Sequence, residues 1–181
     1  DFYAADITGC GGYEEFDIYA FGAFYCHAKP GVPGMHNVSN ATAAAAAAYL
    51  CGITGEAVSK GLASFGGVKR RFERVGEMPG GAVVIDDYAH HPDEIRATLK
   101  AAKAICRGKV YCIFQPHTYS RFIALMPSFA EALALADIVV MADIYAARET
   151  NDTGVSSADI RKYLPEAEYF PDFASIAGFV K

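Results

Sequence analysis

The sequence has few of the features that mark proteins binding nucleic acids or membranes. Its 16 Lys and Arg residues form no dense basic run and are outnumbered by 21 Asp and Glu residues, so we expect no nucleic-acid partner. The longest apolar stretch, residues 41–50, is far shorter than the roughly 20 residues that span a bilayer. Residues 1–6 are polar and aromatic, so the sequence predicts neither a membrane segment nor a signal peptide.

Two motifs are also missing. The five cysteines show no CxxC or zinc-ligand spacing, which is typical of free thiols in a reducing cytoplasm. We therefore expect a cytoplasmic protein. No GxxxxGK[ST] loop occurs, so the main phosphate cradle of any bound nucleoside triphosphate must lie elsewhere.

The residues that are present predict an α/β fold. Hydrophobic residues make up 52% of the 181 positions and charged residues 20%, which suffices for one domain or two small ones with a real core. Residues 16–21 and 24–27 are aromatic-rich and predict antiparallel strands. An alanine-rich helix follows over residues 41–50, with Asn37, Ser39 and Asn40 as possible caps.

A second helix is predicted to start at the cap Thr54 and to place Val58, Leu62 and Phe65 toward a core. The glycine pair at 66–67 is the best internal boundary.

Beyond that boundary, predicted strands alternate with predicted helices. The strands are 82–85, 110–114, 138–142 and 168–170, and the helices are 92–105, 120–136 and 157–163. This alternation indicates a mainly parallel sheet with right-handed crossovers. Ligands of such sheets bind beyond the carboxyl ends of the strands, which directs attention to the loops 86–92, 115–121 and 143–154.

The loop 86–92 combines two carboxylates with two imidazoles: Asp86, Asp87, His90 and His91. Such a group could bind a metal, perform acid–base chemistry, or hold ribose hydroxyls and a substrate carboxylate. Helix capping by Asp with incidental histidines is the structural alternative. A two-metal hydrolase would need further carboxylates, and of the other two loops only the segment 143–149 offers any.

Three other segments carry candidate ligand-binding residues. Arg121 lies in the first turn of a predicted helix, where cations are disfavoured, and an anionic ligand would explain it; Ser120 could cap that helix. Residues 68–73 place three cations beside an aromatic, which suits phosphate contact at a domain junction. His36, Asn37 and Asn40 precede the alanine helix, and a buried Asn there could pair with the edge of a purine.

Together these segments resemble the Mur ligases, most closely the members that add L-alanine. The matching segments follow the order and spacing of that family and are residues 33–41, 68–73, 86–92, 114–121 and 143–149. The resemblance implies a three-domain cytoplasmic enzyme of which this chain is the C-terminal portion. Residues 1–66 would be the end of a P-loop-type central ATPase domain, and residues 67–181 a Rossmann-like C-terminal domain that is incomplete at its end.

The resemblance also implies a reaction and its participants. ATP, with Mg²⁺, would phosphorylate the lactyl carboxylate of UDP-N-acetylmuramate, and L-alanine would attack the acyl phosphate. The P-loop, the main metal ligands and the N-terminal domain would belong to missing parts of the same enzyme, so we expect this chain to be inactive alone.

The resemblance assigns roles residue by residue. Its catalytic residues would be Arg71 and His90, and its ATP-binding residues His36, Asn37, Asn40, Arg71 and Asp87. Its substrate-binding residues would be Tyr88, His90 and Arg121, and the chain would supply no metal ligand. Two alternatives stay open: a stand-alone nucleotide-binding module without chemistry, and a metal-dependent hydrolase built on Asp86, Asp87, His90 and His91.

Overall fold

The computed structural model describes all residues from Asp1 to Lys181. The chain forms two compact units, Asp1–Tyr88 and Ala89–Lys181, and each is described by itself. The domain boundary between residues 66 and 67 stays a prediction.

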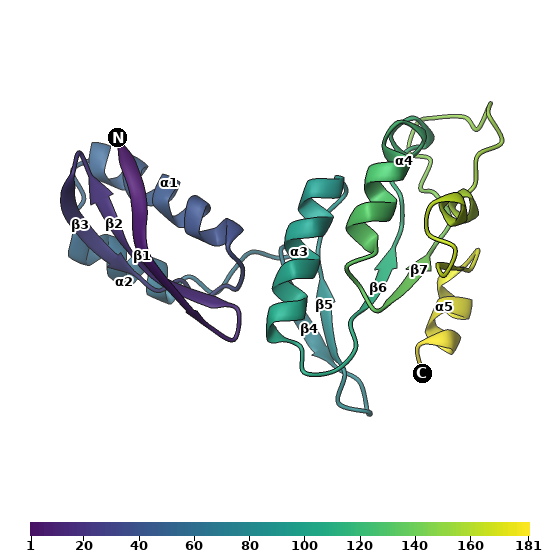
Figure 1. The fold of residues 1–181 in the computed structure, drawn as a ribbon, viewed down its shortest axis with the longest axis horizontal. Helices are drawn as coiled ribbons and strands as arrows, with labels where there is room; N and C mark the ends of the chain where they lie inside the picture. Colours follow the sequence, from purple (N-terminus) through teal and green to yellow (C-terminus); the bar gives the residue numbers. More distant parts are fainter. The chain divides into compact units, whose positions relative to one another are not determined.

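The first unit opens with an antiparallel sheet of three sequential strands (Figure 1). They are β1 (Phe2–Cys10), β2 (Tyr13–Ala20) and β3 (Ala23–Ala28). The two strands predicted in this region are confirmed as β2 and β3, which pair antiparallel. In β2 the side chains alternate, because Phe16, Ile18 and Ala20 are buried while the residues between them are not.

Two helices, α1 (His36–Leu50) and α2 (Gly55–Ser64), pack against the buried face of this sheet. The core they form with the strands comprises Phe16, Ile18, Cys26, Ala28, Val38, Ala41, Ala45 and Val58. Thr54 caps α2 as predicted, accepting a hydrogen bond from Ala57 N at 3.4 Å. Phe65 is 45% exposed, contrary to prediction, because α2 ends one residue earlier and Phe65 has an extended backbone.

The predicted caps of the alanine helix are wrong. Helix α1 begins at His36, and its N-cap Met35 makes no side-chain hydrogen bond. Asn37 and Asn40 therefore lie inside the first turns. Asn37 is instead bonded to the chain before the helix, because its Nδ2 donates to the Pro33 carbonyl at 2.8 Å.

The first unit ends in a hairpin formed by β4 (Glu73–Glu77) and β5 (Val83–Asp86). The sequence predicts β5 as a buried strand of the parallel sheet, and both properties are wrong. It pairs antiparallel with β4, and Val83 and Val84 are 49% and 40% exposed. The strand β4 was not predicted, because its Glu- and Arg-rich sequence, which contains Gly76, has little β-propensity.

The second unit contains the predicted parallel sheet, in the order β6-β7-β8. Its strands are β6 (Tyr111–Phe114), β7 (Ile138–Met141) and β8 (Glu168–Tyr169). The main helices are α3 (Pro92–Ile105), as predicted, and α4 (Tyr119–Leu133). Residues 157–163, predicted as a helix, form the 3₁₀ helix η1 (Ser157–Lys162), and the short helix α5 (Phe173–Phe179) was not predicted.

Both faces of β7 are covered, as in doubly wound folds. Val139 and Met141 pack with residues of α3, α4 and η1 in the larger core, while Val140 packs with Ile176 of α5. Packing on both faces therefore holds the strands, and with them the start of the loops at their carboxyl ends, in place. No helix of the chain is both long enough and apolar enough to cross a bilayer.

Phe122 tests how much the larger core contributes to stability. Its side chain is fully buried and its ring lies 6.1 Å from that of Phe129. We expect Phe122→Ala to lower the free energy of unfolding by about 3–5 kcal/mol, because it leaves a cavity that the core cannot fill. Urea unfolding followed by circular dichroism measures the loss. Its neighbour Ile123 is 42% exposed, so Ile123→Ala should cost less than about 1 kcal/mol; equal losses would contradict this core.

Candidate functional site

In the first unit, the basic segment 68–73 is bonded to the residues that follow β5. The Phe72 N–H donates to Oδ2 of Asp87 at 3.0 Å, and the Tyr88 N–H donates to the Arg70 carbonyl at 2.8 Å. Arg70 and Phe72 have φ angles of +58° and +52°, which are rare for residues with side chains. These bonds hold the strained turn beside the predicted ligand-binding residues.

Both arginines of this turn approach one aromatic ring. The guanidinium carbons of Arg70 and Arg71 each lie 5.9 Å from the centre of the Tyr88 ring, within the range of cation–π attraction. The structure therefore brings Arg71, Asp87 and Tyr88 together.

The start of α1 carries the other predicted nucleotide-binding residues. Asn40 Nδ2 donates to Asn37 Oδ1 at 3.0 Å, so the two side-chain amides are bonded to each other on the helix. Asn40 is exposed, which corrects the expectation of a second Asn buried against alanines: it projects from the face of α1 that the sheet does not cover.

Electrostatics connect this helix start with Asp87. Desolvation lowers the pKa of His36, and the charge of Asp87 opposes that shift. His36 therefore lies within electrostatic reach of the Asp87 carboxylate, and both belong to the predicted ATP-binding set.

In the second unit, the start of α3 assigns a structural role to one of the two predicted histidines. His91 is the N-cap, and its Nδ1 accepts a hydrogen bond from Asp93 N at 3.3 Å. Glu94 completes a capping box by accepting the N–H groups of His90 and His91 at 2.9 and 3.2 Å. The structural alternative of helix capping by Asp is not what the structure shows: the cap is a histidine, because the residue directly before Pro92 occupies that position.

His90 extends the site toward the loop after β6. Its ring centre lies 6.4 Å from that of His117, and His117 lies 5.5 Å from the ring of Tyr145 in the loop after β7. The backbones of these two loops are also paired, because Tyr145 N donates to the Pro116 carbonyl at 2.8 Å and Thr118 N donates to the Tyr145 carbonyl at 2.9 Å. Three aromatic side chains thus form a row at the carboxyl ends of the strands.

Arg121 and Ser120 lie in the first turn of α4. Ser120 does not cap this helix, since Thr118 is the N-cap residue and makes no side-chain cap bond. Instead Ser120 donates through its N–H and hydroxyl to Glu149, at 2.9 and 2.5 Å. Arg121 is half-buried, and its Nη1 is buried without a hydrogen-bond partner. An unpaired guanidinium nitrogen is costly, and an anionic ligand would satisfy it.

His117, Tyr145 and Glu149 were not among the predicted site residues. All three lie in loops that the strand-end rule already selects. The sequence does not reveal that the loops after β6 and β7 pair with each other. This pairing brings residues into direct contact that lie about 30 positions apart, such as Ser120 and Glu149.

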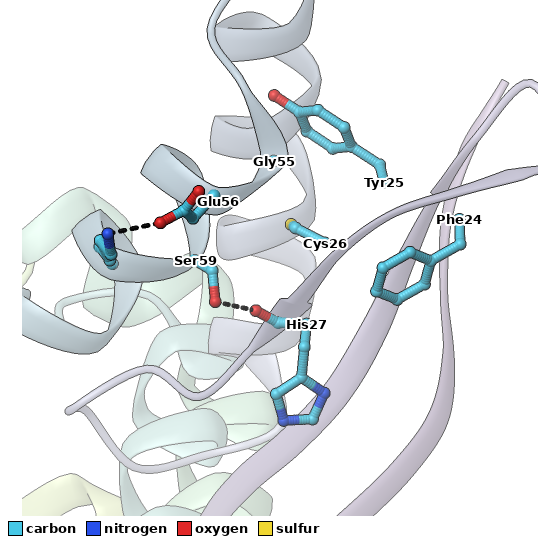
Figure 2. Close-up of a pocket in the computed structure, with 8 residues that line it drawn as sticks. Phe24, Tyr25, Cys26, His27, Gly55, Glu56 and Ser59 are labelled. Atoms are coloured by element: carbon cyan, nitrogen blue, oxygen red, sulfur yellow. Dashed lines mark hydrogen bonds and ion pairs between the residues drawn. The ribbon is translucent and has the colours of Figure 1, made fainter.

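A separate cleft of about 350 Å³ lies between β3 and α2. Figure 2 shows Ser59 donating to the His27 carbonyl, a bond of 2.6 Å. Glu56 pairs with Lys60. The other polar side chains of the lining are also bonded, since the His27 ring contacts Asp17 and Glu15 and the Tyr25 hydroxyl donates to the Ile53 carbonyl. None of the predicted site residues lines the cleft. It is a packing feature of the first unit.

No three His, Cys, Asp or Glu side chains of the chain are arranged to hold a metal ion. The metal-dependent hydrolase alternative therefore gains no support from the geometry.

His91 provides a test of the capping assignment. We expect His91→Ala to lower the free energy of unfolding by about 1 kcal/mol, whereas His91→Asn should retain it because Asn is a good N-cap. Urea unfolding measures both, with Lys100→Ala, on an exposed position of α3, as the control. A loss in His91→Asn as large as in His91→Ala would contradict the cap.

Comparison with known proteins identifies relatives that align with almost the entire length of this chain. Residues 70–180 match the family model described as Mur ligase, glutamate ligase domain. The chain is 46% identical over 185 residues to a UDP-N-acetylmuramate–L-alanine ligase of Caldicellulosiruptor saccharolyticus, and 47% identical over 189 residues to one of Agathobacter rectalis. Each alignment covers 99% of this chain but 40% of the relative.

Solved structures give the same result. The crystal structure of the UDP-N-acetylmuramate–alanine ligase MurC of Thermotoga maritima superposes with a TM-score of 0.81 at 31% identity. The match covers 99% of this chain and 39% of that one. The α/β fold with its parallel three-stranded sheet is therefore that of the corresponding part of this ligase.

Proposed function

Because this chain belongs to the Mur ligase family, we propose that it is the C-terminal portion of a cytoplasmic enzyme that joins L-alanine to UDP-N-acetylmuramate in peptidoglycan precursor synthesis. The observation that carries the proposal is the 46% identity to a ligase of that name across 99% of the chain. The chain spans about 40% of that relative's length, so the activity is proposed for the full-length ligase. The remaining domains of the same enzyme are its partners.

The proposed reaction forms an amide in two steps. The lactyl carboxylate of UDP-N-acetylmuramate attacks the γ-phosphorus of ATP, giving an acyl phosphate and ADP. The amine of L-alanine then attacks the acyl carbon, and phosphate leaves while the nitrogen loses a proton. Carboxylate is a poor electrophile, and phosphorylation supplies its leaving group, so the protein contributes mainly positioning and charge neutralisation.

The first unit would bind the nucleotide. We assign the adenine contact to Asn37 and Asn40, with His36 beside them, and the ribose hydroxyls to Asp87. Arg71 would neutralise charge on the γ-phosphate during transfer. The electrostatic proximity of His36 to Asp87 supports this grouping. The bond from the Phe72 N–H to Asp87 also supports it, because it holds the residue after Arg71 against that carboxylate. Mg²⁺ would be bound mainly by residues outside this chain.

The loops of the second unit would contact the carboxylate substrates. We assign this role to His90 and Arg121, and in the first unit to Tyr88. The buried, unpaired Nη1 of Arg121 supports it, because a substrate carboxylate would supply the missing acceptor.

Phosphate release by purified protein tests the proposed activity. We expect the full-length ligase to release phosphate only when ATP, UDP-N-acetylmuramate and L-alanine are all present. The 181-residue chain should release none, because it has no P-loop. Phosphate release from ATP by the full-length ligase without either acceptor would favour a different nucleotide-hydrolysing function.

Arg71 tests the phosphate contact in the full-length ligase. We expect Arg71→Ala to lower kcat on the order of 10²-fold while KM for ATP changes little, because charge grows on the transferring oxygens in the transition state. Arg71→Lys should recover only part of the loss, since an ammonium lacks the planar fork. Arg70→Ala is the matched control, because it removes the same contact with Tyr88. If Arg70→Ala were crippling and Arg71→Ala harmless, the assignment would be wrong by one residue.

A further inference from the structure

The N-terminus of α4 is capped from a distant part of the chain. Its N-cap Thr118 has φ +68° and makes no side-chain cap bond, and its first turn contains no acidic residue. The loop after β7 supplies the missing acceptor. Oε2 of Glu149 accepts the Ser120 N–H at 2.9 Å, and Oε1 accepts the Ser120 hydroxyl at 2.5 Å.

This carboxylate is a permanent anion at neutral pH. The hydroxyl and N–H of Ser120 lower the pKa of Glu149 most, and the Tyr119 N–H and Thr118 hydroxyl add to the effect. The Ser120 N–H at the positive end of α4 is thus already bonded to a protein carboxylate. The buried Nη1 of Arg121 remains the unpaired donor of this turn that a substrate anion could use.

Arg121 is the next residue of the same turn. The direction of the Arg121 side chain depends on where the first turn of α4 begins and on the contacts that hold that turn. At the far end of the side chain, the buried Nη1 has no hydrogen-bond partner that could fix it. The contacts that fix the turn are the backbone pairing of Thr118 with Tyr145 and the bonds of Ser120 to Glu149.

We propose that Glu149 is a positioning residue that holds Arg121 ready to bind a substrate carboxylate. The proposal rests on the proposed function, which supplies that carboxylate from L-alanine or from UDP-N-acetylmuramate. Glu149 itself touches neither substrate. It fixes the first turn of α4 and leaves the guanidinium as the only cationic group of that turn.

The chain contains a matched control for a purely structural cap. Asp172 caps α5 with the same chemistry: its carboxylate accepts the N–H and the hydroxyl of Ser175, both at 2.8 Å. Those bonds likewise lower the pKa of Asp172. Helix α5 carries none of the proposed site residues.

Steady-state kinetics of the full-length ligase separate positioning from stability. Glu149→Ala should raise KM for a carboxylate substrate, L-alanine or UDP-N-acetylmuramate, on the order of tenfold, while KM for ATP changes less than about twofold. Glu149→Gln keeps one acceptor and should lie in between. Asp172→Ala should lower the melting temperature but leave every KM unchanged. Unchanged values in Glu149→Ala, or an equal rise in Asp172→Ala, would overturn the proposal.

A second measurement needs no activity. In the 181-residue chain, the NMR signal of the Arg121 Nε–H should shift in Glu149→Ala and stay in place in Asp172→Ala. If the wild-type ligase proves inactive, the proposed function fails, and this signal alone decides the positioning. An Arg121 signal that is unchanged in Glu149→Ala would reject it whatever the enzyme does.

Discussion

Tyr145 extends the pairing of β6 and β7 beyond the ends of both strands, and the arrangement of the second unit's loops depends on this. Its N–H donates to the Pro116 carbonyl and its own carbonyl accepts the Thr118 N–H, at 2.8 and 2.9 Å. The chain after β6 is therefore fixed up to Thr118, the N-cap of α4. Because these bonds involve only backbone atoms, they leave the side chains of His117 and Tyr145 available to the site.

The same constraint explains how distant segments meet. Once the two loops are paired, Glu149 lies where the first turn of α4 needs an acceptor, and His117 lies between Tyr145 and His90. The strand cores beneath, with Met141 fully buried, give this end of the sheet a rigid support. Rigid strands carrying functional loops are the usual division of roles in α/β proteins.

The sequence was informative where local signals agreed. Pro92 at the first turn, together with the spacing of Ile95 and Leu99, predicted α3 with its observed bounds. The strand-end rule selected the loops after β6 and β7, whose backbones are paired in the structure. Prediction failed where the partner of a group is remote. Ser120 looked like a cap because Glu149, its actual partner, lies 29 positions away, and β5 looked buried because its antiparallel partner β4 was not recognised.

In both units, a carboxylate accepts a backbone N–H next to a proposed ligand-binding arginine. In the first, Asp87 accepts the Phe72 N–H directly after Arg71, in a turn where Phe72 has φ +52°. In the second, Glu149 accepts the Ser120 N–H directly before Arg121, in a turn that starts from Thr118 at φ +68°. Strained backbone of this kind costs roughly 1–3 kcal/mol per residue and persists only where the surroundings enforce it. In each turn a carboxylate bonded to the backbone N–H next to the arginine supplies this enforcement.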